Sequence, residues 1–167
     1  FAKKITVQLP SYINRYPFFL RKKIVCISNP VKQQSFKELP NESMQEKKVI
    51  LHVGRLSFQK NQEFLLRAFA LIASKYPDWR LRFIGDGEYS DYLNKLAVEL
   101  EINKQCDFVG VKNTLEDWYK ESSIFAFPSL WEGFPNALAE ALSCGVPAIG
   151  FKKTAGVNEL IESGVTG

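Results

Sequence analysis

The segment SIFAFPSLWEGFPNALAEALSCGVPAIGF, residues 123–151, contains a strand–helix–strand unit. Its first six and last five residues are short, mostly apolar runs, typical of buried strands. Between them, Gly133 and Pro135 indicate a turn, and residues 136–143 have the composition of a helix. Such a unit predicts two parallel strands joined by a crossover helix.

The same alternation fills the chain before this segment. The sequence predicts strands over 49–53, 81–85 and 106–110, and helices from Asn61 to Tyr76, over 89–100 and over 114–119. A last helix is predicted near 157–162, and residues 24–28 are a candidate for one more strand at the front. This order predicts an α/β fold: a Rossmann-like, doubly wound parallel sheet with helices on both faces. The polar residues 32–48 are interpreted as a connector.

Length and composition exclude several classes of protein. A chain of 167 residues suits one globular domain, and a net charge of +4 is too small to indicate a nucleic-acid partner. No apolar run approaches the ~18 residues that a bilayer crossing requires. The three cysteines, Cys26, Cys106 and Cys144, form no metal-spaced pair. They are interpreted as reduced, buried small residues of a cytoplasmic protein.

The first 37 residues contain eight Lys or Arg and no Asp or Glu. Phe18, Phe19 and Leu20 lie among these basic residues. Two interpretations of this segment remain. The favoured one is a linker or domain-interface segment, and the other is a surface that binds an anionic membrane. The chain begins with Phe, its only Met is Met44, and it stops straight after a helical pattern. We therefore expect it to be a piece of a longer protein.

In parallel sheets, ligands bind outside the carboxyl ends of the strands. The loop GRLSFQKNQ, which starts at Gly54, carries Arg55 and Lys60 just before a helix. These two residues form either a diphosphate clamp or two solvated surface cations. The loop GDGEY holds Gly85 and Gly87, which either allow a ligand to approach or simply form a turn. It is not a dinucleotide fingerprint, because the third glycine is missing.

The turn inside residues 129–147 places Glu132 before a helix start and Glu140 within the helix. Backbone N–H groups near 133–137 favour a phosphate there, and each carboxylate can accept two hydroxyl donors. A nucleotide-sugar, with a diphosphate between two hydroxylated rings, fits this arrangement. In the alternative interpretation Glu140 only complements the helix dipole and Glu132 is an exposed loop residue. The single histidine, His52, is interpreted as a core residue rather than a catalyst.

Five stretches, in this order, resemble the C-terminal, donor-binding half of the family 4 glycosyltransferases: VGRLSFQKN, FIGDGEY, FVG, FPSLWEGFPNALAEALSCGVPAI and GVNELIESGVTG. These are retaining enzymes of the GT-B architecture, in which two Rossmann-like domains face each other across a cleft. The resemblance covers residues 24–167, the expected nucleotide-sugar-binding domain without its C-terminal helix. Residues 1–23 are then a residual interdomain or N-terminal-domain segment.

The resemblance implies roles for individual residues. Arg55 and Lys60 would bind the donor diphosphate, Glu132 would lie near the donor sugar, and Glu140 would hold the ribose hydroxyls. The backbone at Val111 would meet the base. The other implied substrate-binding positions are Gly54, Gly85, Gly87, Ser129, Gly133, Phe134, Pro135 and Asn136. No metal or other cofactor is expected, because the cations take the place of a metal.

The expected function is transfer of a hexose from a nucleotide-sugar, UDP-sugars first and GDP-sugars next, to a glycan or lipid-linked acceptor. We expect a role in bacterial polysaccharide or lipid-linked glycan synthesis, in the cytoplasm or at the cytoplasmic face of the membrane. The isolated chain is expected to bind donor weakly and to transfer nothing. Three rivals are a non-catalytic nucleotide-binding module, a pyridoxal phosphate sugar phosphorylase and a flavodoxin-like signalling domain.

Overall fold

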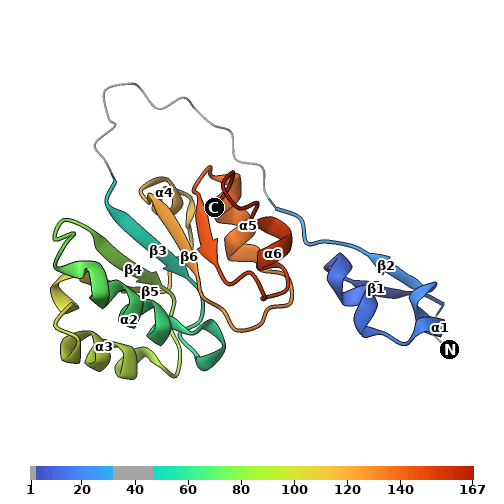
Figure 1. Ribbon diagram of the computed structural model, residues 1–167, viewed down its shortest axis with the longest axis horizontal. Coiled ribbons are helices and arrows are strands. Elements are labelled where there is room, and N and C mark those ends of the chain that lie inside the picture. The colour runs from blue at the N-terminus through green and yellow to red at the C-terminus, as the bar shows by residue number, and fades with distance from the viewer. Residues whose placement is uncertain (1–2, 32–46) are drawn as a thin grey trace.

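The computed structural model describes residues 3–31 and 47–167. Figure 1 shows a large α/β domain and, to its right, a small unit formed by the first residues of the chain. Residues 32–46, which include most of the predicted connector, lie outside the described residues. The predicted domain boundary between residues 23 and 24 stays a prediction.

The large domain is built on five strands that pair in parallel in the order β5-β4-β3-β6-β7 (Figure 1). The chain enters at the central strand, adds two strands on one side, and returns to add two on the other. The strands are β3 Val49–Val53, β4 Arg80–Ile84, β5 Cys106–Gly110, β6 Ile124–Phe127 and β7 Ala148–Gly150. The predicted Rossmann-like parallel sheet is confirmed.

Successive residues of the strands enter cores on opposite faces of the sheet. Ile50, Leu81 and Phe83 pack against one helix layer, and Leu51 and Phe125 belong to a second core. The first layer consists of α2 (Gln62–Ala73) and α3 (Ser90–Glu99); the second consists of α4 (Glu116–Lys120), α5 (Asn136–Ser143) and α6 (Val157–Leu160). Both faces of the sheet are covered, so the central strand β3 is apolar on both sides except at His52, and the doubly wound arrangement is confirmed.

Helix α2 begins after Asn61, as the sequence predicts, but Asn61 does not cap it. Its backbone is left-handed, with a φ of 55°, and its side chain makes no capping hydrogen bond. The side-chain amide instead donates to the carbonyl oxygen of Pro128 at 3.2 Å. This bond ties the loop after β3 to the loop after β6.

The small unit pairs β1 (Ile5–Val7) in parallel with β2 (Ile24–Cys26). A 3-10 helix, η1 (Pro10–Arg15), and a single helical turn, α1 (Phe18–Arg21), connect the two strands. The strand predicted over 24–28 therefore exists but does not join the five-stranded sheet. Cys26 is exposed on this two-stranded sheet and Cys106 and Cys144 are half-buried, so the prediction of three buried cysteines is wrong.

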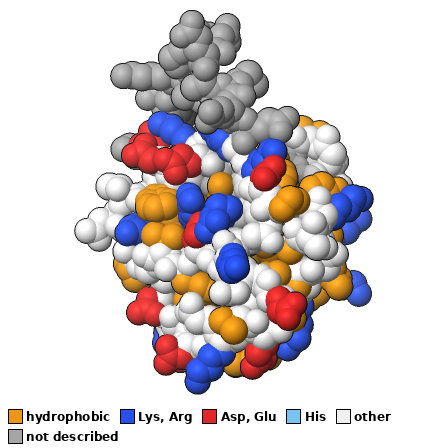
Figure 2. Space-filling model, turned by 90° about the vertical axis from the view of Figure 1, so that its left-hand side faces the viewer, with side chains coloured by type: hydrophobic (Ala, Val, Ile, Leu, Met, Phe, Trp, Pro, Cys, Tyr) orange, Lys and Arg blue, Asp and Glu red, His pale blue; other side chains and the backbone are white. Residues whose placement is uncertain are grey.

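The surface of the large domain carries charges of both signs. Figure 2 shows one face, on which Lys and Arg side chains are interspersed with Asp, Glu and hydrophobic side chains. Interspersed charges give only a weak long-range field. None of the helices in the two described ranges combines the length and apolarity that crossing a membrane requires.

Candidate functional site

Two loops that the sequence predicts to bind ligand meet at the centre of the sheet. Strand β3 pairs with β4 on one side and with β6 on the other, so the strand order reverses there. The loop after β3 (residues 54–61) and the loop after β6 (residues 128–135) leave the same edge of the sheet. Open α/β sheets bind ligands at such a topological switch point.

Lys60 and Glu132 come from these two loops and form an ion pair. The Lys60 Nζ lies 2.6 Å from Glu132 Oε1, and the two side chains retain 18% and 7% of their exposure. The ammonium also lies 5.2 Å from the centre of the Phe127 ring. The Tyr12 hydroxyl, from η1, bonds the backbone oxygen of Glu132 and lies 3.3 Å from that of Gly133. Glu132, the acid expected near a donor sugar, is therefore fixed at its carboxylate by Lys60 and at its backbone by Tyr12.

Arg55 lies in the same loop as Lys60 but has a different partner. Its guanidinium pairs with Glu88 of the loop after β4 at 3.0 Å, and both side chains are largely exposed. Thus the described contacts do not bring Arg55 and Lys60 together around one point. The diphosphate clamp stays a prediction, in which an incoming anion would draw Arg55 away from Glu88.

Gly85 and Gly87 have a packing role in this structure. A Cβ at Gly85 would lie 2.0 Å from the oxygen of Gly54, and one at Gly87 would lie 2.3 Å from the oxygen of Leu56. The two glycines therefore let the loop after β4 lie directly against the loop after β3. Whether they also leave room for a ligand is a separate prediction.

The start of α5 follows the Glu132 loop directly. Pro135 occupies the N-cap position without a capping side-chain bond, and the first turn holds no acid. Gly133 and Asn136 are exposed, Phe134 is half-buried and Pro135 is buried. An uncapped helix start leaves N–H groups that favour an anion. Ser129, another implied substrate-binding position, is fully buried, and its Oγ has no hydrogen-bond partner among the described residues.

Glu140 lies further along α5 and lines a cavity of about 340 Å³. Its Oε2 accepts a hydrogen bond of 3.0 Å from the buried hydroxyl of Tyr119, on α4. Burial, together with the Glu140 charge, raises the pKa of Tyr119 far above its ordinary value, so the hydroxyl stays a donor. Val111 is 70% exposed just past β5. The remaining cavity residues are Asn113, Thr114, Leu115, Glu116 and Cys144.

A buried polar network supports the loop after β3. The His52 ring is fully buried, with Nδ1 2.9 Å from the Ala126 oxygen and Nε2 3.1 Å from Gln62 Nε2. The Nδ1–H tautomer satisfies both bonds. Gln62 Nε2 also lies 2.8 Å from the Arg55 oxygen, and its Oε1 accepts from the Ser57 N–H. Burial lowers the pKa of His52 to about 4, which fits the predicted core role.

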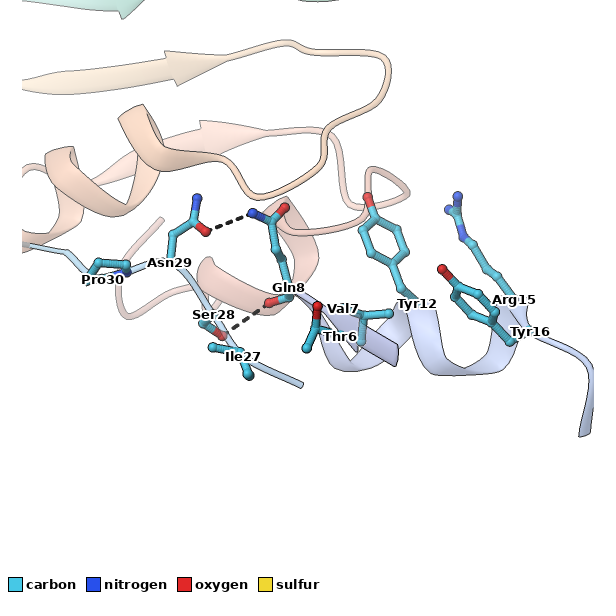
Figure 3. A pocket seen from close by; sticks show the side chains of 10 residues that line it. All are labelled: Thr6, Val7, Gln8, Tyr12, Arg15, Tyr16, Ile27, Ser28, Asn29 and Pro30. Carbon is cyan, nitrogen blue, oxygen red and sulfur yellow. Dashed lines mark hydrogen bonds between the residues drawn. The ribbon is translucent and has the colours of Figure 1, made fainter. Parts of the chain in front are cut away.

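The small N-terminal unit contacts the Glu132 loop and helix α5 through side chains that belong to no sequence motif. This unit lines an open groove of about 820 Å³, and in it Gln8 donates to the Asn29 side-chain oxygen at 2.8 Å, a bond drawn in Figure 3. Asn29 in turn donates to the Oδ1 of Asn136, the first residue of α5. Ser11 bonds the Glu159 carboxylate. Residues of the small unit therefore contact the candidate site directly. No helical or strand periodicity in their sequence predicts these contacts.

The parallel order and the reversal at β3 define a Rossmann-like α/β domain, a class in which ligands bind at the switch point. The family described as "Glycosyl transferases group 1" matches residues 33–167. The chain belongs to this family and is a GT-B glycosyltransferase domain. The narrower assignment to family 4 stays a prediction.

Individual relatives agree with this assignment. An uncharacterized glycosyltransferase of Haemophilus influenzae is 36% identical over 146 residues, which are 86% of this chain and 40% of that protein. A UDP-Gal:alpha-D-GlcNAc-diphosphoundecaprenol alpha-1,3-galactosyltransferase of Escherichia coli is 32% identical over 139 residues, covering 76% of this chain and 36% of that one. The chain thus spans well under half the length of these relatives.

Solved structures show the same fold. The apo form of the lipopolysaccharide outer core galactosyltransferase WaaB superposes with a TM-score of 0.79 at 25% identity, covering 99% of this chain and 48% of that one. The HepE protein of Anabaena, solved with UDP-glucose, gives a TM-score of 0.82 at 24% identity, covering 100% and 49%. Both alignments span almost the whole of this chain and about half of the other protein.

Proposed function

We propose that this chain is the donor-binding half of a retaining hexosyltransferase that uses a nucleotide-sugar, with a UDP-sugar as the first candidate. One observation carries the proposal: the Lys60–Glu132 pair lies at the switch point of the sheet, on the edge where ligands bind. The UDP-glucose complex of HepE and the UDP-galactose named for the Escherichia coli relative support the choice of UDP.

Each part of the donor would meet a different group of the site. The diphosphate would meet Lys60, Arg55 and the N–H groups at the start of α5. Glu132 would accept hydroxyls of the donor sugar, and Glu140 those of the ribose. The base would lie near Val111, just past β5.

The chemistry follows from charge. When the anomeric C–O bond breaks, its electron pair goes to the leaving diphosphate oxygen. The acceptor oxygen bonds the anomeric carbon, and its proton passes to the leaving phosphate or to water. Cations and helix N–H groups placed at the diphosphate stabilise that charge as it develops. Glu132 would orient the sugar, and no residue of this chain is assigned as a covalent nucleophile.

The acceptor is a glycan or a lipid-linked glycan under this proposal, and the work is polysaccharide or lipid-linked glycan synthesis in the cytoplasm. Support comes from a Campylobacter jejuni relative, 34% identical over 113 residues, whose name describes transfer to a diphospho-undecaprenol acceptor. Because the relatives are more than twice as long, we propose that this chain alone binds donor without transferring it. Sugar transfer by the isolated chain to any acceptor in a panel would contradict this part.

Calorimetric titration tests the donor proposal. The chain is titrated with UDP, UDP-glucose, UDP-galactose, UDP-N-acetylglucosamine and GDP-mannose. We expect binding of one nucleotide class with a preference for one sugar, and loss of that sugar preference in Glu132→Gln. Equal affinity for nucleotide and nucleotide-sugar, unchanged by Glu132→Gln, would instead indicate a non-catalytic nucleotide-binding module. The absence of any binding would overturn the proposal.

A further inference from the structure

Tyr119 is buried, and its one polar side-chain atom points to an acid that lines a cavity. Its residue exposure is 2%, and its ring packs edge-to-face against Phe125 at 5.8 Å between centres. A phenylalanine would fill the same space without a polar atom to satisfy. The hydroxyl instead donates to Glu140 Oε2 at 3.0 Å.

The Glu140 carboxylate keeps further capacity to accept hydrogen bonds. Among the described residues, Tyr119 is the one recorded partner of its side chain, and it bonds only Oε2. An ionised carboxylate offers about four lone-pair positions on its two oxygens. Glu140 therefore has Oε1 and part of Oε2 available toward the cavity of about 340 Å³ that it lines.

A carboxylate binds a diol more tightly when its plane is fixed before the diol arrives. A glutamate side chain has three rotatable bonds, and ordering it costs free energy that is subtracted from binding. A hydrogen bond from a rigid, buried ring supplies this order before the ligand arrives. Among the described residues, Tyr92 also donates to a glutamate carboxylate, that of Glu63 at 2.7 Å, but this pair is exposed on the surface between α2 and α3.

We infer that Tyr119 is a positioning residue, which holds the Glu140 carboxylate so that its free oxygen accepts the vicinal hydroxyls of a ribose. The inference rests on the proposed nucleotide-sugar function and adds a residue to it. Tyr119 does not contact the ligand's reacting atoms. Its effect is confined to the part of the ligand that carries the diol.

The test compares each protein's preference for a diol, using the 167-residue chain. Among UDP, GDP and ADP, the tightest-binding nucleotide is titrated beside its 2′,3′-dideoxy analogue. The ratio of the two dissociation constants reports the diol alone. We expect wild type to prefer the ribose form at least about tenfold, since hydrogen bonds to a charged group are strong. Tyr119→Phe should lower this ratio about fivefold and leave the affinity for the dideoxy analogue unchanged.

Controls separate positioning from general damage. Tyr92→Phe removes a similar Tyr–Glu bond elsewhere and should leave the ratio unchanged. Glu140→Asp withdraws the carboxylate from Tyr119 by about one bond length and should lower the ratio as Tyr119→Phe does. Urea unfolding of each variant confirms that it is folded.

Each outcome decides a different point. If Tyr119→Phe weakens binding of the ribose and dideoxy nucleotides equally, or changes neither affinity, the positioning role is wrong while the proposed function stands. If wild type binds nucleotides but shows no preference for the ribose form, Glu140 does not recognise the diol and the inference falls. If no nucleotide binds at all, the proposed function and this inference fail together.

Discussion

The ammonium of Lys60 lies 2.6 Å from the carboxylate of Glu132, and this contact joins the loop after β3 to the loop after β6. Both side chains are mostly buried, so each charge depends on the other for compensation. A diphosphate that takes Lys60 would release Glu132 to bind sugar hydroxyls. The pair therefore couples the two parts of the proposed donor site.

Removing both partners of this pair should destabilise the fold by less than the sum of the two single removals. Lys60→Met or Glu132→Gln leaves a largely buried charge uncompensated. We expect each to cost about 2 kcal/mol, below the ~3–5 kcal/mol found for fully buried pairs. In urea unfolding, the double variant should cost at least ~1 kcal/mol less than the sum. The exposed pair Glu63–Arg67, treated in the same way, serves as control and should couple by under ~0.5 kcal/mol. Additive losses at Lys60 and Glu132 would contradict this prediction.

Arg55→Ala should affect ligand binding without affecting stability. The Arg55–Glu88 pair is largely exposed, so we expect the free energy of unfolding to change by less than ~0.5 kcal/mol. Dissociation constants for UDP and UDP-sugars should rise about tenfold, because a charge-assisted bond to phosphate is lost. Uridine, which carries no phosphate, should bind as it does to wild type. Arg67→Ala provides the surface control. If Arg55→Ala spares UDP, the clamp assignment is wrong.

The sequence predicts the large domain well because apolar strands and amphipathic helices alternate without interruption. Ile50 and Leu51 follow each other in one strand and enter opposite cores, as a sheet covered on both faces requires. Strand ends then locate the ligand edge by topology alone. The loops carrying Lys60 and Glu132 were predicted on this basis, and the structure brings those two residues together.

Contacts between distant side chains were not predictable in the same way. Tyr119 lies in a short amphipathic helix, where an aromatic residue signals only burial, and nothing local indicates its bond to Glu140. Tyr12 and Asn29 belong to a segment without helical or strand periodicity of useful length. Their contacts to Glu132 and Asn136 depend on how that segment packs, which the loop sequence does not specify.

Gly85→Ala should be strongly destabilising because the added methyl group would collide with backbone. Its Cβ would lie 2.0 Å from the Gly54 oxygen, and its φ of 135° is unfavourable for alanine. Gly110 is a matched control, since it also has a positive φ, 75°, but nothing lies within 4 Å of its added Cβ. We expect Gly110→Ala to cost about 1 kcal/mol from backbone strain and Gly85→Ala at least ~2 kcal/mol. Equal costs in urea unfolding would show that loop packing at Gly85 is relaxed.

His52 should make the stability of the domain fall in mildly acidic solution. Its folded-state pKa of about 4 lies below its ordinary value of 6.5, because burial disfavours the charged ring. Between those two pH values the unfolded chain binds a proton that the folded chain does not, so the free energy of unfolding decreases as pH falls. The expected loss is about 3 kcal/mol from pH 6.5 to pH 4, and it should stop below pH 4. In His52→Asn, whose amide can still donate to the Ala126 oxygen, this part of the slope should be missing. Parallel pH profiles of wild type and variant, measured by urea unfolding, would show that His52 does not titrate as its burial requires.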